Sequence, residues 1–144
     1  MITGDDYITL AARLAERKGA GEASYRSAVS RAYYGAFHLA GAFLSELGLS
    51  IPKGAVAHGW VPQAFIGSAQ QDAVEVGRLL QDLHAERIIA DYRWERRATG
   101  NQVDAKTSVN TARAIGTLLA ACAEPEQKRA IKSAISSYLQ KRGG

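Results

Sequence analysis

The sequence contains a single cysteine, Cys122, among its 144 residues. One cysteine excludes an intrachain disulfide and a cysteine-rich metal site, and such low use of cysteine fits a reducing compartment. The uncharged run from Ala32 to Ser45 is shorter than the roughly 20 apolar residues that a membrane-spanning helix needs. The first residues lack the basic start and apolar run of a secretory signal, so we expect a cytoplasmic protein.

The familiar signatures of cofactor and metal sites are also missing. The sequence has no glycine-rich phosphate loop, no paired cysteines and no residues at zinc-ligand spacing. Its three histidines, His38, His58 and His84, fall in three different predicted elements, which gives no support for a shared metal ion. We therefore expect neither a metal nor another cofactor. The formal net charge of +4 permits an anionic partner such as nucleic acid without requiring one.

Apolar residues recur at helical period through most of the chain, and no segment alternates as a strand would. The length favours one domain over residues 1–144, with a core at about 5–123 and a C-terminal helix after it. The predicted fold is all-α, an up-and-down bundle of four to five helices. The predicted helices lie at about 5–18, 22–47, 68–92, 103–123 and 125–140.

The predicted helix at 22–47 organises the rest of the chain. Small residues, among them Gly35 and Gly41, crowd it and allow another helix backbone to approach closely, including one from a second copy of the chain. Gly48, flanked by leucines, resembles a C-terminal glycine cap, and Thr3 with Asp6 resembles a capping box for the preceding helix. Its apolar seam follows steps of four and three through Tyr25, Val29, Ala32, Ala36, Leu39, Phe43 and Leu47.

The segment at about 50–67 contains two of the three prolines and interrupts the helical pattern, so we expect an irregular loop with a short helix near its end. Trp60 is expected to plug the end of the bundle, and His58 to satisfy a backbone group of the loop. A ligand contact is the alternative for both side chains. Ser68 lies three residues before Gln71, which predicts a capping box at the start of the next helix.

Two polar stripes run along the two longest predicted helices. They consist of Arg31, Tyr34 and His38 on the first, and His84, Arg87 and Asp91 on the second. If these helices pack antiparallel, the two stripes could meet. A histidine transfers protons near neutral pH and an arginine clamps a phosphate, which together suffice for metal-independent RNA cleavage. Alternatively, Arg31 and Asp91 form a buried ion pair that sets the helix register, or the residues bind a ligand without chemistry.

A basic run with an aromatic residue follows the second stripe. Its members are Arg93, Trp94, Glu95, Arg96 and Arg97. The arginines could bind a nucleic-acid backbone while Trp94 stacks on a base. The alternative is a solvated helix end whose basic side chains interact with the helix dipole.

The stretch Ser30–His38, read as SRAYYGAFH after Tyr25, resembles the "SRAYYAAFHAA" signature of HEPN-domain proteins, and most closely their small stand-alone prokaryotic branch. The resemblance continues at His58 and over Leu79–Tyr92, which ends in Ala-Asp-Tyr. It implies a helical bundle that is often a homodimer and is encoded beside partners such as minimal nucleotidyltransferases. Many members are RNA-cleaving toxins or defence effectors, and others bind a nucleotide or RNA without catalysis.

The ribonuclease motif of that family is an arginine, four to six residues, and a histidine, often followed by a tyrosine that the partner modifies with AMP. In the region that ends at Tyr92, Ala90 occupies the position expected for the histidine, whereas Arg31 and His38 satisfy the spacing on the earlier helix. For a toxin–antitoxin or defence ribonuclease, we therefore expect His38 to act as general acid or base, Arg31 and Arg87 to clamp phosphate and Asp91 to orient. Tyr34, His84 and Tyr92 are the expected supporting residues. The alternatives are a non-catalytic module that binds a nucleotide or a nucleotidyltransferase, and a helical dimerisation protein.

Overall fold

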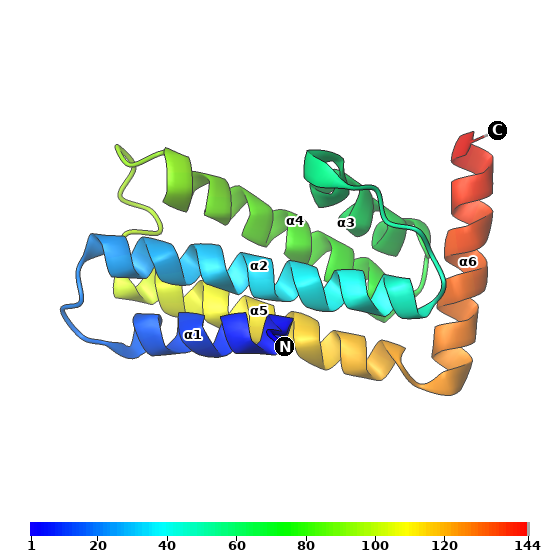
Figure 1. Ribbon diagram of the computed structural model, residues 1–144, viewed down its shortest axis with the longest axis horizontal. Helices are drawn as coiled ribbons and strands as arrows, with labels where there is room; N and C mark the ends of the chain where they lie inside the picture. The colour runs from blue at the N-terminus through cyan, green and yellow to red at the C-terminus, as the bar shows by residue number, and fades with distance from the viewer. Residues whose placement is uncertain (144) are drawn as a thin grey trace.

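Six α-helices and one short 3-10 helix form the chain over residues 1–143, which are the residues that the computed structural model describes. They are α1 (Gly4–Glu16), α2 (Glu22–Glu46), η1 (Gly54–Val56), α3 (Ala57–Gly67), α4 (Gln71–Tyr92), α5 (Gln102–Cys122) and α6 (Pro125–Gly143). Helices α1, α2, α4 and α5 run alongside one another, α3 packs on α4, and α6 crosses one end of the bundle (Figure 1). The prediction of an all-α bundle is confirmed, and this part of the chain contains no strand.

The helix count exceeds the prediction because the segment at 50–67 is mostly helical. Its residues form η1 and α3, although Pro62 lies inside α3. Val61 and Phe65 are fully buried, so packing against α4 outweighs the low helix propensity of the prolines and glycines. The capping box predicted at Ser68 is wrong, because α4 begins at Gln71 and the Ser68 hydroxyl donates to the Phe65 carbonyl instead, at 2.6 Å.

The predicted capping box at the start of the first helix and the predicted glycine cap at the end of the second are confirmed. Thr3 and Asp6 form a reciprocal capping box at the start of α1. After α2, Gly48 has φ +85°, which a glycine adopts without a Cβ penalty. The amide of Leu49 then donates to the Leu44 carbonyl at 3.2 Å, the bond of a Schellman motif.

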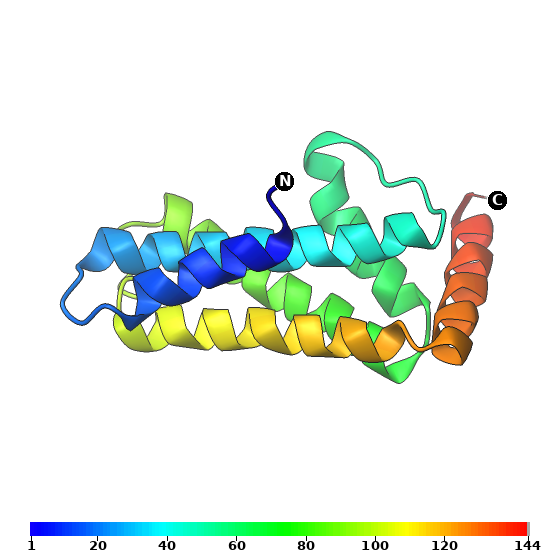
Figure 2. The same ribbon diagram turned by 60° about the horizontal axis from the view of Figure 1, so that its bottom comes forward.

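The small residues of α2 allow α1 to cross it closely, as predicted. A Cβ on Gly35 would lie 2.7 Å from the Gly4 carbonyl oxygen and 2.6 Å from the Ile8 side chain. Figure 2 shows the start of α1 passing over the middle of α2. The crossing fixes the rotation of α2 about its own axis, because the face that carries Gly35 must point towards α1. The two neighbouring faces of α2 therefore point away from α1.

None of the helices over residues 1–143 combines the length and the hydropathy that a membrane span requires.

Candidate functional site

Imidazole, phenol and guanidinium groups gather where α2, α3 and α4 meet. We call this group the His–Arg cluster; it consists of Tyr33, Tyr34, His58, His84, Arg87 and Asp91. Helix α2 supplies the two tyrosines, α3 supplies His58, and α4 supplies the other three residues from consecutive turns. The cluster is half-buried, apart from the fully buried Tyr33.

His58 is held by a tyrosine and an aromatic ring of α2. The hydroxyl oxygen of Tyr33 lies 2.5 Å from His58 Nδ1, and the ring of Phe37 stacks on the imidazole with centroids 4.6 Å apart. The bond to Nδ1 leaves Nε2 as the ring nitrogen available to a ligand. Burial raises the pKa of Tyr33, so its hydroxyl keeps its proton. The prediction that His58 satisfies a backbone group of the loop is wrong.

The second imidazole lies directly beside the first. The rings of His58 and His84 stack with centroids 5.7 Å apart. Burial lowers the pKa of His58, and repulsion from His84 in its protonated form, from Arg87 and from protonated His38 lowers it further. Burial and the charge of Arg87 lower the pKa of His84 in the same way. Both rings are therefore neutral at pH 7, because each titrates below the ordinary value of about 6.5.

Arg87 is held on three sides. Its Nη2 donates to the Tyr34 hydroxyl at 2.5 Å, and its guanidinium lies over the rings of Tyr34 and Tyr92, at 5.0 and 5.4 Å from their centroids. Its Nε lies 2.9 Å from Asp91 Oδ2, although the N–H does not point along that line, so the contact is an ion pair. Asp91 also accepts a hydrogen bond from Ser30 Oγ at 3.1 Å. These contacts fix the orientation of the Arg87 guanidinium.

The structure brings only part of the two predicted stripes together. Tyr34 meets Arg87 as expected, but Arg31 and His38 are exposed and turn towards α1. The Arg31 guanidinium lies 5.7 Å from the centroid of the Tyr7 ring, and His38 meets the same ring edge-on at 6.2 Å. The predicted ion pair between Arg31 and Asp91 is wrong, because Asp91 pairs with Arg87 on its own helix. The catalytic roles predicted for Arg31 and His38 therefore depend on their sequence spacing alone.

Sequence reasoning overlooked Arg26, which is 6% exposed and supports the segment between α4 and α5. Its guanidinium donates to the carbonyls of Ile89, Ala90, Arg93, Trp94 and Arg96 and to the Thr99 hydroxyl. The last carbonyls of a helix have no partner inside the helix, so one buried cation satisfies the end of α4 and the turn after it. In the sequence, the only indication of this role was the position of Arg26 on α2, directly beside the apolar seam.

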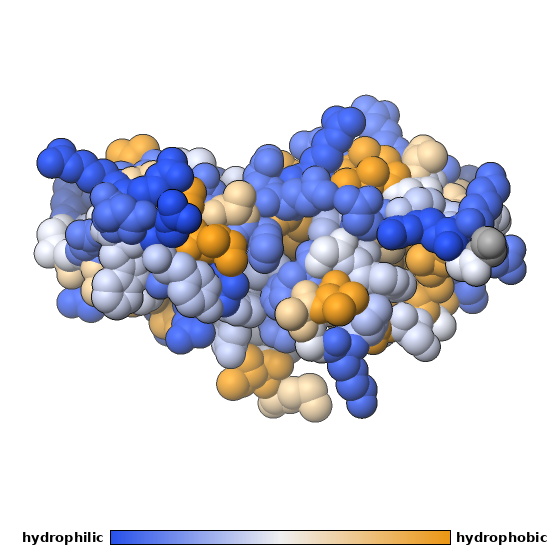
Figure 3. All heavy atoms as spheres, turned by 90° about the horizontal axis from the view of Figure 1, so that it is seen from above, coloured by the Kyte–Doolittle hydropathy of each residue, from blue (hydrophilic) through white to orange (hydrophobic). Residues whose placement is uncertain are grey.

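Arg26 holds the backbone of residues 93–97, which we call the basic segment, while the side chains of that segment reach solvent. Trp94 is 74% exposed, and the three arginines are exposed as well. Arg93 pairs with Glu95 at 2.9 Å, a contact that also lowers the pKa of Glu95, after the larger effect of its backbone hydrogen bond. Figure 3 shows hydrophilic side chains gathered at the end of the molecule where Figure 1 places the turn between α4 and α5.

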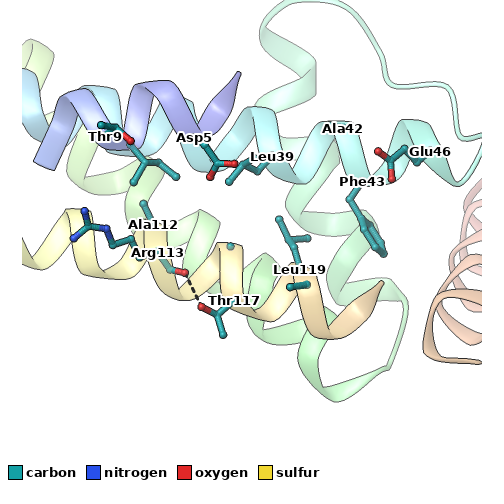
Figure 4. Close-up of a pocket in the computed structure, with 13 residues that line it drawn as sticks. Asp5, Thr9, Leu39, Ala42, Phe43, Glu46, Ala112, Arg113, Thr117 and Leu119 are labelled. Atoms are coloured by element: carbon teal, nitrogen blue, oxygen red, sulfur yellow. Dashed lines mark hydrogen bonds between the residues drawn. The ribbon is translucent and has the colours of Figure 1, made fainter. Parts of the chain in front are cut away.

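A groove of about 660 Å³ between α1, α2 and α5 offers a different environment. Its charged side chains are Asp5, Glu46 and Arg113, and the last two lie at opposite ends (Figure 4). The Thr117 hydroxyl is already used, because it donates to the Arg113 carbonyl at 3.2 Å. This groove has no imidazole or phenol, so we place the candidate site at the His–Arg cluster. Within residues 1–143, no three metal-ligating side chains come close enough to hold an ion.

The model of the HEPN domain family matches residues 5–122, from the start of α1 to the end of α5. The chain belongs to the HEPN family. This confirms the resemblance found in the sequence, and the matched region contains the whole His–Arg cluster and the basic segment of this HEPN protein. The comparisons with curated proteins and with solved structures each found no match.

Proposed function

We propose that this HEPN protein binds RNA along the basic segment and cleaves it at the His–Arg cluster without a metal ion. The observation that carries the proposal is the stacking of His58 on His84, 5.7 Å apart, beside the guanidinium of Arg87. Two imidazoles supply a proton acceptor and a proton donor, and a guanidinium stabilises the charge of a pentacovalent phosphorane. The neighbouring arginines and the net charge of +4 favour a polyanionic substrate.

In the proposed reaction, the 2′-oxygen of a ribose attacks the adjacent phosphorus and the bond from phosphorus to the 5′-oxygen breaks. Nε2 of His58 accepts the proton of the 2′-hydroxyl, and protonated His84 donates a proton to the leaving 5′-oxygen. His58 is assigned as the base because more positive groups surround it, which favours its neutral form. The products are a 2′,3′-cyclic phosphate and a 5′-hydroxyl end.

The experiment measures cleavage of a labelled RNA by the purified protein in the presence of EDTA. We expect cyclic phosphate ends from the wild type, and a rate about 10²- to 10⁴-fold lower for His58→Ala and His84→Ala. Because His58 bonds Tyr33, His58→Asn serves as a second variant that keeps a polar atom near Nδ1 if the alanine variant does not fold. His38→Ala is the matched control, since His38 is an exposed histidine of α2.

Loss of cleavage in His38→Ala, with full activity in His58→Asn, would support the assignment made from the Arg-x6-His spacing and contradict the one proposed here. Cleavage that requires a divalent cation would contradict the metal-independent mechanism.

A second candidate is a non-catalytic HEPN module that binds RNA or a nucleotide. Arg87 favours it, because the side chain is only 14% exposed and is already engaged by Tyr34, Asp91 and Tyr92. Retained RNA binding without any cleavage would select this function.

We place either function in a toxin–antitoxin or defence setting, with a second copy of the chain and a nucleotidyltransferase as expected partners, on the basis of family membership. Light scattering of the purified protein tests the dimer, and a neighbouring nucleotidyltransferase gene would support the pairing.

A further inference from the structure

A groove of about 480 Å³ lies between the start of α2 and the end of α4, next to the His–Arg cluster. Asp91 belongs to both, since it lines the groove and also contacts Arg87 at 2.9 Å. The groove is also lined by Glu22, Ala23, Arg26, Ser27 and Trp94. A nucleotide whose phosphate reaches Arg87 could therefore place its base in this groove.

One of the residues that line the groove is aromatic, Trp94. The backbone carbonyl of Trp94 accepts a hydrogen bond from Arg26 Nη2 at 3.4 Å, while the indole is 74% exposed. The ring is thus attached to a fixed backbone without being packed into the core. Stacking of a base on such a ring contributes about 1–3 kcal/mol. Ala23 and Ser27, one helical turn apart on α2, are small enough to leave room for a flat ring.

The charged groups of the groove that remain free to bind a ligand are carboxylates, which accept hydrogen bonds. Arg26 Nε donates to Oε1 of Glu22 at 2.8 Å and not to Oε2, and the Glu22 side chain is 58% exposed. The contacts of Asp91 with Arg87 and Ser30 both use Oδ2. Within residues 1–143, Oε2 of Glu22 and Oδ1 of Asp91 accept no hydrogen bond, and Oε1 of Glu22 keeps its second lone pair, so both oxygens of Glu22 can accept from a ligand. The guanidinium of Arg26 is itself committed to backbone carbonyls, so it does not supply a donor for a second phosphate.

Carboxylate acceptors select among the four RNA bases. Guanine alone presents two adjacent N–H donors, N1–H and N2–H, which match the two oxygens of one carboxylate. Adenine and cytosine place a ring-nitrogen lone pair beside their amino group, and uracil flanks its single N–H with two carbonyl oxygens. In those three bases, a lone pair would face the carboxylate and be repelled.

We propose that this groove is a guanine subsite, in which the base stacks on Trp94 and its Watson–Crick edge donates to Glu22. The inference deepens the proposed function, because it makes guanine the base recognised beside the scissile phosphate. Discrimination of this kind is strong when the wrong base leaves a polar group of the site unpaired.

Isothermal titration calorimetry with GMP, AMP, CMP and UMP tests the subsite without any need for cleavage. We expect GMP to bind at least tenfold more tightly than the other three. Glu22→Gln should weaken GMP binding about tenfold or more, because an amide can still accept from Arg26 Nε but turns a donor towards the base. Trp94→Ala, at an exposed position, should weaken it comparably without affecting the fold. Glu46→Gln is the matched control, since Glu46 is an exposed, ion-paired carboxylate at the other end of α2.

Equal affinities for the four nucleotides, or GMP binding that is unchanged in both Glu22→Gln and Trp94→Ala, would overturn the subsite. RNA cleavage without a preference for guanine would overturn it too, while leaving the proposed ribonuclease intact. Selective GMP binding by a protein that cleaves no RNA would support the subsite and contradict the ribonuclease, so the two failures are distinguishable.

Discussion

Replacing Arg26 with methionine should loosen the basic segment and destabilise the whole chain. The substitution keeps much of the apolar stem but removes the guanidinium that satisfies five backbone carbonyls and the Thr99 hydroxyl. Thr99 is fully buried and has φ +71°, a conformation that a β-branched residue rarely adopts, so the turn depends on these bonds to stay in place.

The magnitude follows from the burial of Arg26. Removing one partner from a buried charged contact costs about 3–5 kcal/mol, because the groups left behind stay desolvated without a bond. In a chain of this size, 3 kcal/mol corresponds to a fall in the melting temperature of about 6–12 °C. Arg31→Met on the same helix is the matched control. Within residues 1–143, the exposed side chain of Arg31 interacts only with the Tyr7 ring. Loss of this guanidinium should therefore lower the free energy of unfolding by less than about 1 kcal/mol.

Thermal and urea unfolding measure the change in stability, and limited digestion with trypsin measures the local effect at the arginines of the basic segment. We expect Arg26→Met to be cut at residues 93–97 at temperatures where the wild type and Arg31→Met stay intact. If Arg26→Met melts within about 2 °C of the wild type, or if Arg31→Met is equally destabilised, the role assigned to Arg26 is wrong.

The packing of α2 and the histidine pair lead to further predictions. Gly35→Ala should destabilise the protein by about 1–3 kcal/mol in urea unfolding because of the close crossing with α1. Gly41→Ala, whose Cβ would meet nothing closer than 3.7 Å, should be neutral or stabilising by up to about 1 kcal/mol. Stability should fall as the pH drops below about 6.5, because the pKa values of His58 and His84 are lowered in the folded state and the unfolded chain then binds protons first; thermal melts should show a shallower fall in the double variant H58N/H84N. The proposed cleavage should have its optimum below pH 6.5, where His84 can be protonated, and Tyr33→Phe should lower the rate and shift this optimum because His58 Nδ1 loses its partner.

Local patterns in the sequence were sufficient for most of the helices and their ends. Apolar spacing predicted α1, α2, α4, α5 and α6, because each helix needs one buried stripe at its own period. The capping residues Thr3 and Gly48 were recognisable because they act within a few residues of chain. Helix α3 was predicted only as a short helix near the end of a loop, since its full length is stabilised by burial of Val61 and Phe65 against α4 rather than by helix propensity.

The sequence by itself determined that the chain is an all-α member of the HEPN family and that α2 and α4 carry polar residues at helical spacing. Only the tertiary structure decided which ridge of α2 faces α4. Of the predicted ridge, only Tyr34 reaches α4, whereas Arg31 and His38 turn towards α1. The ridge that packs against α4 lies one residue earlier and includes Arg26, Ser30 and Tyr33. One residue turns the helix by about 100°, and both ridges have the same spacing, so periodicity cannot distinguish them. The rotation is set by the close crossing with α1 at Gly35, which is a contact between segments far apart in the chain.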